Sequence, residues 1–332
     1  MNDFRSSPSQ SPQKGFSLSS LRRRLAIPAF AISFVFLFTS LLQLLAVELI
    51  ARTAPQLMDY SWYSWVLSMI PLYAIAMPLS LLFYRSEPAS PPSPKRSIGF
   101  PVFLGLLAIC FALTYAGNLI GQFLNMIIGR FTGTPPANNL QEITLSSPLW
   151  TNLLFCGILA PIMEEIFYRK LLIDCLRCFG DLPAILISGL LFGLIHGNFY
   201  QFFYAALIGL LFGAIYLYTG KIRYTVALHM CINLVGGVYS VEMLKRIDLD
   251  RLTQEPFFEM IQHFGGYAMM FSYAAFVLIA LVGAVVAAIL LYRRRLPLRR
   301  GEYTLSASEW LHVGLLNPAV WVLLFVIILL FL

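Results

Sequence analysis

Charged residues are scarce in this chain of 332 residues. They make up 12% of it, whereas hydrophobic residues make up 59%, and the mean hydropathy is +0.76. Such a composition excludes an ordinary soluble globular domain, in which about a quarter of the residues are charged. The net charge of +7 does not indicate nucleic-acid binding, because Lys and Arg stand in short clusters between apolar runs, as topology signals of membrane proteins do. We predict a multi-spanning membrane protein with no nucleic-acid partner.

Cysteine is also sparse, and the five residues are scattered and odd in number, so no disulfide framework follows. Cys175 and Cys178 have no second pair that would complete a zinc site. The sequence lacks a His-Glu-x-x-His motif, which a helical zinc protease site would show. It also lacks a visible internal repeat, and this absence argues against a transporter built from similar halves.

Apolar runs long enough to cross a bilayer recur along the chain, and each crossing needs about 20 residues. They predict an all-α fold, a polytopic transmembrane helical bundle of about eight to nine spans. The predicted spans cover residues 26–50, 62–84, 100–128, 149–178, 182–196, 200–218, 224–239, 267–292 and 311–332. We divide the chain into a disordered cytosolic tail (1–24), three N-terminal spans (25–147), a core of four spans (148–240), and an extramembrane loop with two C-terminal spans (241–332).

The distribution of Lys and Arg predicts the orientation. When the arginines at 22–24 are placed in the cytosol, the basic clusters at 95–96, 170–177, 221–223 and 293–300 fall on the same side. We therefore expect an integral, multi-pass protein of the plasma membrane with a cytosolic N-terminus. The mixed-charge segment 242–266 is expected to be partly an amphipathic interfacial helix.

Ionisable residues inside the spans are concentrated in the core. Glu164, Glu165 and Arg169 interrupt an apolar run, although a charge in hydrocarbon costs roughly 2.5 to 3.5 kcal/mol even on lenient insertion scales. His196 and His229 lie in two later spans of the core. This concentration predicts a functional site.

Helix geometry allows these residues to meet. Glu164 and His196 each lie 16 positions from the turn at Gly180, roughly 24 Å along antiparallel helices, so we expect them at matching depth. His229 and Asn233 are spaced i, i+4 and share one face of a later helix. We therefore expect all four side chains to face one intramembrane cavity.

Each residue also has a purely structural interpretation. Glu165 and Arg169, at i, i+4, can neutralise each other as an ion pair. A single buried His is commonly an interhelical hydrogen bonder, and Asn233 alone would join two helices in the same way. Glu164 has no such helical partner, and its expected depth match with His196 favours a catalytic role.

Three motifs follow one another: Glu-Glu-x-x-x-Arg at 164–169, Phe-x-x-x-His at 192–196 and His-x-x-x-Asn at 229–233. In these motifs the chain resembles the type II CAAX prenyl endopeptidases and their bacterial relatives, the CPBP intramembrane proteases. The resemblance implies a helical bundle with an active-site cavity within the membrane and hydrolysis of membrane-associated substrates. It further implies a catalytic Glu164, His196 as its partner in activating water, and His229 with Asn233 as oxyanion stabilisers. Glu165 and Arg169 would support them.

The expected function is therefore a glutamic intramembrane endopeptidase without a cofactor, acting on a membrane-associated protein or peptide in the lipid bilayer. One alternative is a zinc-dependent membrane metalloprotease with Glu164, His196 and His229 as ligands. Others are a proton-coupled transporter, since buried Glu, His and Arg also form proton relays, and a non-catalytic, immunity-type membrane protein.

Overall fold

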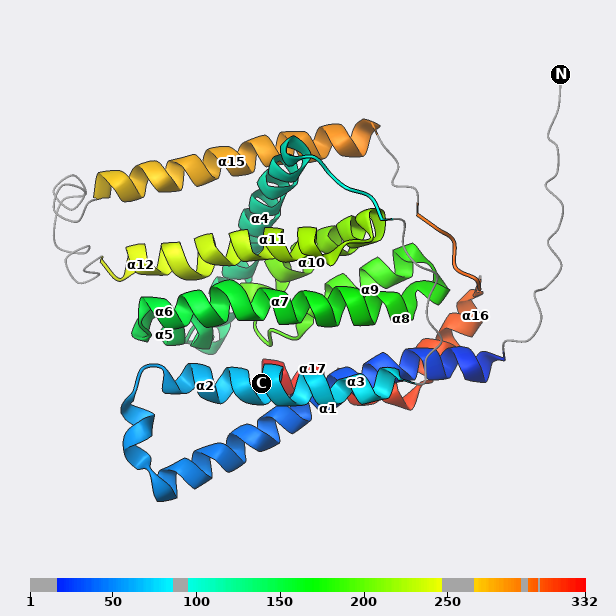
Figure 1. Ribbon diagram of the computed structural model, residues 1–332, viewed down its shortest axis with the longest axis horizontal. Coiled ribbons are helices and arrows are strands. Elements are labelled where there is room, and N and C mark those ends of the chain that lie inside the picture. Colours follow the sequence, from blue (N-terminus) through cyan, green and yellow to red (C-terminus); the bar gives the residue numbers. More distant parts are fainter. Residues whose placement is uncertain (1–16, 86–94, 247–265, 294–297, 304) are drawn as a thin grey trace.

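The structure is a computed structural model that describes residues 17–85, 95–246, 266–293, 298–303 and 305–332. Within these ranges the chain is helical and has no strand (Figure 1). The first half contains α1 (Leu18–Thr53), η1 (Pro55–Asp59), α2 (Tyr63–Met69), η2 (Ile70–Ala76), α3 (Met77–Tyr84), α4 (Phe100–Thr132) and α5 (Asn139–Ser146). The fourth span is built from α6 (Leu149–Thr151), η3 (Asn152–Leu159), α7 (Ala160–Glu165), η4 (Ile166–Ile173), α8 (Asp174–Leu176) and η5 (Arg177–Phe179).

The rest of the described chain continues in the same way. It contains α9 (Asp181–Leu194), α10 (Phe199–Thr219), α11 (Ile222–Asn233), η6 (Leu234–Tyr239), α12 (Ser240–Leu244), α15 (Gly266–Arg293), α16 (Ala307–Trp310), η7 (Leu311–Leu315) and α17 (Pro318–Phe331). Segments η2, η3, η4, η6 and η7 are π-helical turns inside longer helices, whereas η1 and η5 are short 3₁₀ turns.

Seven described helices are long and apolar enough to cross a membrane, or eight if a bent pair at the C-terminal end forms one span. The prediction of an all-α, multi-pass helical bundle is therefore confirmed. The predicted last span is broken, because 307–315 and 318–331 meet at an angle of 62°. The predicted fifth span corresponds to α9, whose 14 residues are too few to cross a bilayer alone.

The first helix begins earlier than the sequence predicted. We expected residues 1–24 to form a disordered tail, but α1 starts at Leu18, and the side chain of Ser17 caps it by accepting a hydrogen bond from the amide of Ser20. Leu21 and Arg24 are buried, so packing extends the helix beyond the apolar run. Residues 1–16 of the predicted tail, and 247–265 of the predicted interfacial loop, lie outside the described residues.

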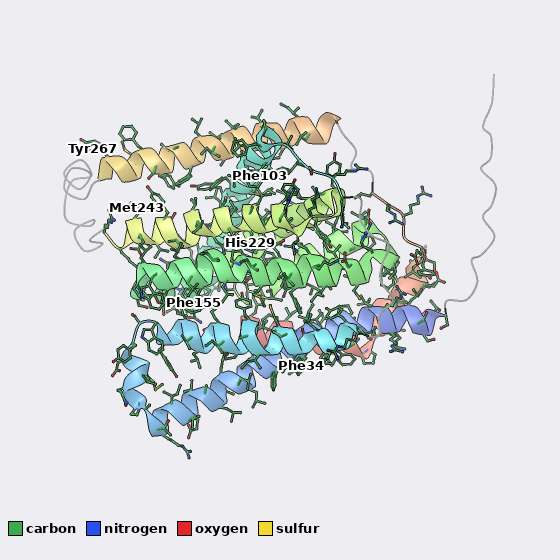
Figure 2. All side chains as sticks on the ribbon, in the orientation of Figure 1. Phe34, Phe103, Phe155, His229, Met243 and Tyr267 are labelled. Atoms are coloured by element: carbon green, nitrogen blue, oxygen red, sulfur yellow. The ribbon has the colours of Figure 1, made fainter. Side chains whose placement is uncertain are left out.

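The fourth span occupies the middle of the molecule. In Figure 1 it runs between α11–α12 on one side and α2–α3 on the other. The ring of Trp65 on α2 stacks on Phe155, and its indole N–H donates to Asn152 at 3.2 Å. His229 on α11 lies beside the fourth span from the opposite side (Figure 2). A residue near the centre of this span can therefore be reached from two neighbouring helices.

Small residues bring the surrounding helices into close contact. A side chain at Gly117 of α4 would collide with the backbone of Tyr204 on α10, and one at Gly283 of α15 would collide with the carbonyl of Ala108 on α4. Such close approach is how helices gain packing energy in lipid. α4 thereby packs against α10 of the predicted core, and α15 packs in turn against α4.

The structure brings the basic clusters together at one end of the bundle. The amide of Arg96 donates to the carbonyl of Thr219 at 2.8 Å, and Lys221 donates to the hydroxyl of Ser97 at 2.7 Å. At the same end, Gly180 pairs with Arg300 in an isolated bridge. The clusters that the sequence assigned to one side of the membrane are thus neighbours.

Candidate active site

Glu164 lies midway between Leu149 and Phe179, the two ends of the fourth span. Its side chain is 12% exposed. Oε1 accepts a hydrogen bond of 2.5 Å from the hydroxyl of Tyr73 on η2, and Oε2 lies 3.8 Å from Nε2 of His229. Glu164 is therefore held in place, yet one of its oxygens faces the histidine without a direct hydrogen bond.

The neighbouring carboxylate, Glu165, is fully buried and paired with Arg169. Nε of Arg169 donates to Oε2 at 3.0 Å and Nη2 donates to Oε1 at 3.3 Å. The remaining Nη1 donates to the hydroxyl of Ser188 on α9 at 2.9 Å, and this hydroxyl donates to the carbonyl of Tyr168. Bidentate, charge-assisted pairing of this kind fixes both groups geometrically. Arg169 therefore links the fourth span to α9.

His229 joins the two glutamates. Its Nδ1 lies 3.2 Å from Oε1 of Glu165, and its Nε2 faces Glu164. Because an ionised carboxylate only accepts hydrogen bonds, Nδ1 must carry the hydrogen in that contact. Nε2 is thus the nitrogen that faces Glu164, and it can donate to a further group only when the imidazole carries both protons.

His196 follows the end of α9 and is partly buried. Its Nδ1 lies 2.8 Å from the carbonyl of Phe192, and since a carbonyl only accepts, Nδ1 carries the hydrogen and Nε2 keeps its lone pair. His196 is within electrostatic range of both Glu164 and His229. Among the hydrogen bonds and ion pairs of the described residues, none joins His196 directly to Glu164. The sequence had predicted the two residues as partners from their matching depth.

Asn233 uses part of its amide group on the backbone of the fourth span. Nδ2 donates to the carbonyl of Cys156 at 2.9 Å. In the π-helical turn η3 the amide N–H of Ala160 donates to the carbonyl of Phe155. The next residue, Pro161, has no N–H. The helix therefore has no backbone donor for the carbonyl of Cys156. Asn233 satisfies it, and a second N–H of the same amide remains for another acceptor.

Two phenylalanines separate these polar groups from the surrounding core. The guanidinium carbon of Arg169 lies 4.8 Å from the ring centroid of Phe192 and 5.8 Å from that of Phe212. The ring of Phe192 meets His196 and His229 edge to face, with centroids 5.3 and 5.6 Å away. Cation–π contacts stabilise a desolvated guanidinium by roughly 2 kcal/mol. Phe192, the first residue of the Phe-x-x-x-His motif, packs at the centre of the site.

The residues proposed as zinc ligands do not converge. Across the described part of the chain, no group of three or more His, Cys, Asp or Glu side chains is placed to hold a metal ion. We therefore derive no step through a metal.

Two residues that contact the site, Tyr73 and Ser188, were not predicted from the sequence. Tyr73 is one of several tyrosines in the second predicted span, and no sequence spacing connects it to Glu164, which lies in another span. Ser188 lies in α9, one turn before Phe192, and a serine there is not distinguishable by pattern from one that bonds its own helix. Neither residue carries a signal that periodicity alone would reveal.

Comparison with known proteins assigns the polar core to a family. Residues 146–235 match the family described as "Type II CAAX prenyl endopeptidase Rce1-like". The match covers the fourth span, α9, α10 and α11. The resemblance that the three motifs predicted is therefore confirmed, and all six predicted site residues lie within the matched range, whereas Tyr73 lies outside it.

One curated protein is also similar to this chain. It is "Putative membrane peptidase YdiL" of Bacillus subtilis (strain 168), which is 22% identical over 161 residues. The aligned part covers 48% of this chain and 65% of the relative, so the chain spans a little under two thirds of that protein's length. No solved structure matches the chain.

Proposed function

We propose that this protein is an intramembrane endopeptidase that hydrolyses peptide bonds of membrane-associated proteins or peptides. The observation that carries the proposal is the difference between the two adjacent glutamates. Glu165 is held in a buried ion pair with Arg169, whereas Glu164 is partly exposed at the centre of the span, beside His229. The Rce1-like match supports the reaction class.

In the proposed reaction, Glu164 accepts a proton from water as the oxygen attacks the carbonyl carbon, and it passes this proton to the amine nitrogen as the C–N bond breaks. His196 orients this water through Nε2, whose lone pair is free because Nδ1 is bound to a carbonyl. The developing oxyanion accepts hydrogen bonds from Nε2 of His229, in the form of the imidazole that carries both protons, and from the second amide N–H of Asn233. Removing one such donor typically slows a hydrolase by about 10² to 10³.

The test is cleavage by the purified full chain in detergent. Two fluorogenic probes are used, a peptide with a prenylated cysteine near its C-terminus and a membrane-anchored peptide without one. Glu164→Gln, His196→Ala and His229→Ala should each lose activity by about 10² or more. Glu242→Gln, a glutamate paired with Lys245 outside the site, is the matched control. Full activity of Glu164→Gln would overturn the proposal.

We also propose that the reaction needs no metal. Activity should survive a strong chelator, and elemental analysis of the active protein should find no stoichiometric zinc. Activity that is lost in chelator and restored by zinc would favour the metalloprotease with the same residues instead.

For orientation, we propose that the end of the bundle carrying Arg96 and Lys221 faces the cytosol of the plasma membrane. Reporter enzymes that are active on one side of the membrane, fused after Tyr84 and after Leu244, test this. The first fusion should report the cytosol and the second the outside. The reverse result would invert the assignment.

A further inference from the structure

The interface between the second and fourth spans carries a row of phenol groups. Tyr73 lies on η2 and Tyr84 at the end of α3, whereas Tyr168 lies on η4, one turn after Glu164. Tyr73 and Tyr168 are buried. Polar groups at such an apolar interface need partners.

The two helices run parallel, and their register is constant along this row. Tyr73 hydrogen bonds to Glu164, 91 positions further along the chain. The same offset separates Tyr84 from Cys175, and these two side chains are within electrostatic range of each other. Tyr168 lies between the two pairs and interacts electrostatically with Glu164 and Tyr84. The row therefore extends from the candidate general base along the interface.

Two of the hydroxyls are buried and unpaired. The hydroxyls of Tyr84 and Tyr168 make no hydrogen bond to any described residue. Leaving a buried hydroxyl unpaired is costly, and buried water commonly satisfies such groups where two or more polar partners are within reach. Tyr168 has Tyr73 and Glu164 within electrostatic range, so a water there would have several partners.

The far end of the row reaches the basic end of the bundle. The thiol of Cys175 donates to the carbonyl of Arg24 at 3.7 Å. Arg24 belongs to the basic cluster at the start of α1. The eleven residue steps from Tyr73 to Tyr84 span roughly 16 Å of helix, about half of the hydrocarbon core. The row thus connects the middle of the membrane to one of its surfaces.

We propose that this row of hydroxyls is a water path, which supplies the hydrolytic water to Glu164 from the end of the bundle near Arg24. The inference rests on the proposed function, because hydrolysis consumes one water for each bond cleaved. The ligand is water, held by the hydroxyls of Tyr84, Tyr168 and Tyr73 in turn.

One test does not require activity. Tyr168→Cys is placed in the full chain together with Glu164→Gln, and a small, charged, water-soluble thiol reagent is added to membranes. Peptide mass spectrometry then reports labelling at position 168. Ile166→Cys is the control, since Ile166 is 39% exposed on the same helix and faces lipid. We expect labelling at 168 at least tenfold faster than at 166, and equal or slower labelling at 168 overturns the path even if the protein is not a protease.

The second test uses hydrolysis. Tyr84→Phe and Tyr168→Phe remove one hydroxyl each and should lower kcat by about three- to tenfold with KM unchanged, because neither hydroxyl is among the groups proposed to contact the substrate. Tyr63→Phe is the matched control, because its hydroxyl is also buried and unpaired within the described chain but lies on the other side of Tyr73. If all three variants have the same kcat, the path is wrong while the proposed protease is unaffected.

Discussion

The hydroxyl of Tyr73 donates a 2.5 Å hydrogen bond to Oε1 of Glu164, across 91 positions of the chain. This bond joins a helix outside the Rce1-like range to the carboxylate at the centre of the candidate site. It leaves Oε2 facing His229. The orientation of the proposed general base is thus set by a span that the family match does not include.

Tyr73→Phe should lower kcat by about tenfold, because the carboxylate of Glu164 loses the donor that fixes its rotamer. A neutral hydrogen bond contributes roughly 1 kcal/mol and one to a charged group somewhat more, so the midpoint of unfolding should fall slightly. Steady-state cleavage and thermal unfolding in detergent measure the two effects. Tyr115→Phe on α4 is the control, and an unchanged kcat in Tyr73→Phe would contradict the positioning role.

Glu164→Gln and Glu165→Gln should differ in stability. Glu165→Gln leaves the guanidinium of Arg169 buried without its counter-ion, and breaking a buried pair from one side costs about 3 to 5 kcal/mol. Glu164→Gln keeps a side chain that can still accept from Tyr73, so its free energy of unfolding should change by about 1 kcal/mol or less. Reversible unfolding in mixed micelles measures both.

The exposed pair of Glu48 and Arg52 is the control for burial, because it has the same i, i+4 spacing. Arg52→Ala should cost about 0.5 kcal/mol or less, as is usual for surface pairs on helices. Equal destabilisation by Arg52→Ala and Glu165→Gln would mean that burial does not determine the strength of the Arg169 pair.

Asn233→Ala should reduce both activity and stability, because its amide serves the carbonyl of Cys156 and, in the proposed reaction, the oxyanion. The two roles can be separated. Adding Pro161→Ala restores a backbone N–H next to that carbonyl, so the double variant should recover part of the lost stability, about 1 kcal/mol, but none of the lost kcat. Recovery of kcat in the double variant would show that Asn233 acts only on the backbone.

Gly197→Ala should lower kcat by moving His196. Gly197 has φ of +64°, a left-handed conformation that is strained for alanine. An added methyl group would also collide with the carbonyl of Leu330 at the end of α17. Gly133→Ala is the control, since φ there is +84° but no atom lies within 4 Å of the added methyl group. Cleavage assays on both variants test this, and an equal loss of activity would show that backbone strain alone is responsible.

The sequence predicted the elements better than their mutual arrangement. Apolar runs predicted the helices, and the motif spacing predicted which helices carry polar groups, because both depend on local periodicity. The i, i+4 pair of Glu165 and Arg169 is present because it lies within one helix. The catalytic roles of the six residues stay predictions.

Contacts between helices were harder to predict. The sequence paired Glu164 with His196 by depth alone, but depth does not fix the rotation of a helix about its axis. Four π-helical turns lie in the spans around the site, and each changes the rotation of the residues that follow it relative to a regular period of 3.6 residues. His229, rather than His196, therefore faces Oε2 of Glu164, and Tyr73 reaches the other oxygen from a distant span.

The short helix α9 has a consequence for how the protein enters the membrane. Its 14 residues extend about 21 Å, less than the roughly 30 Å of hydrocarbon that an independent segment must cross during synthesis. We expect α9 to insert together with the preceding span, as a hairpin closed at Gly180. In that hairpin Ser188 meets Arg169 as soon as the guanidinium leaves water, and Glu165 already accompanies it on the same helix. We therefore expect Arg169 to have both of its partners, Glu165 and Ser188, once this hairpin has been synthesised and inserted.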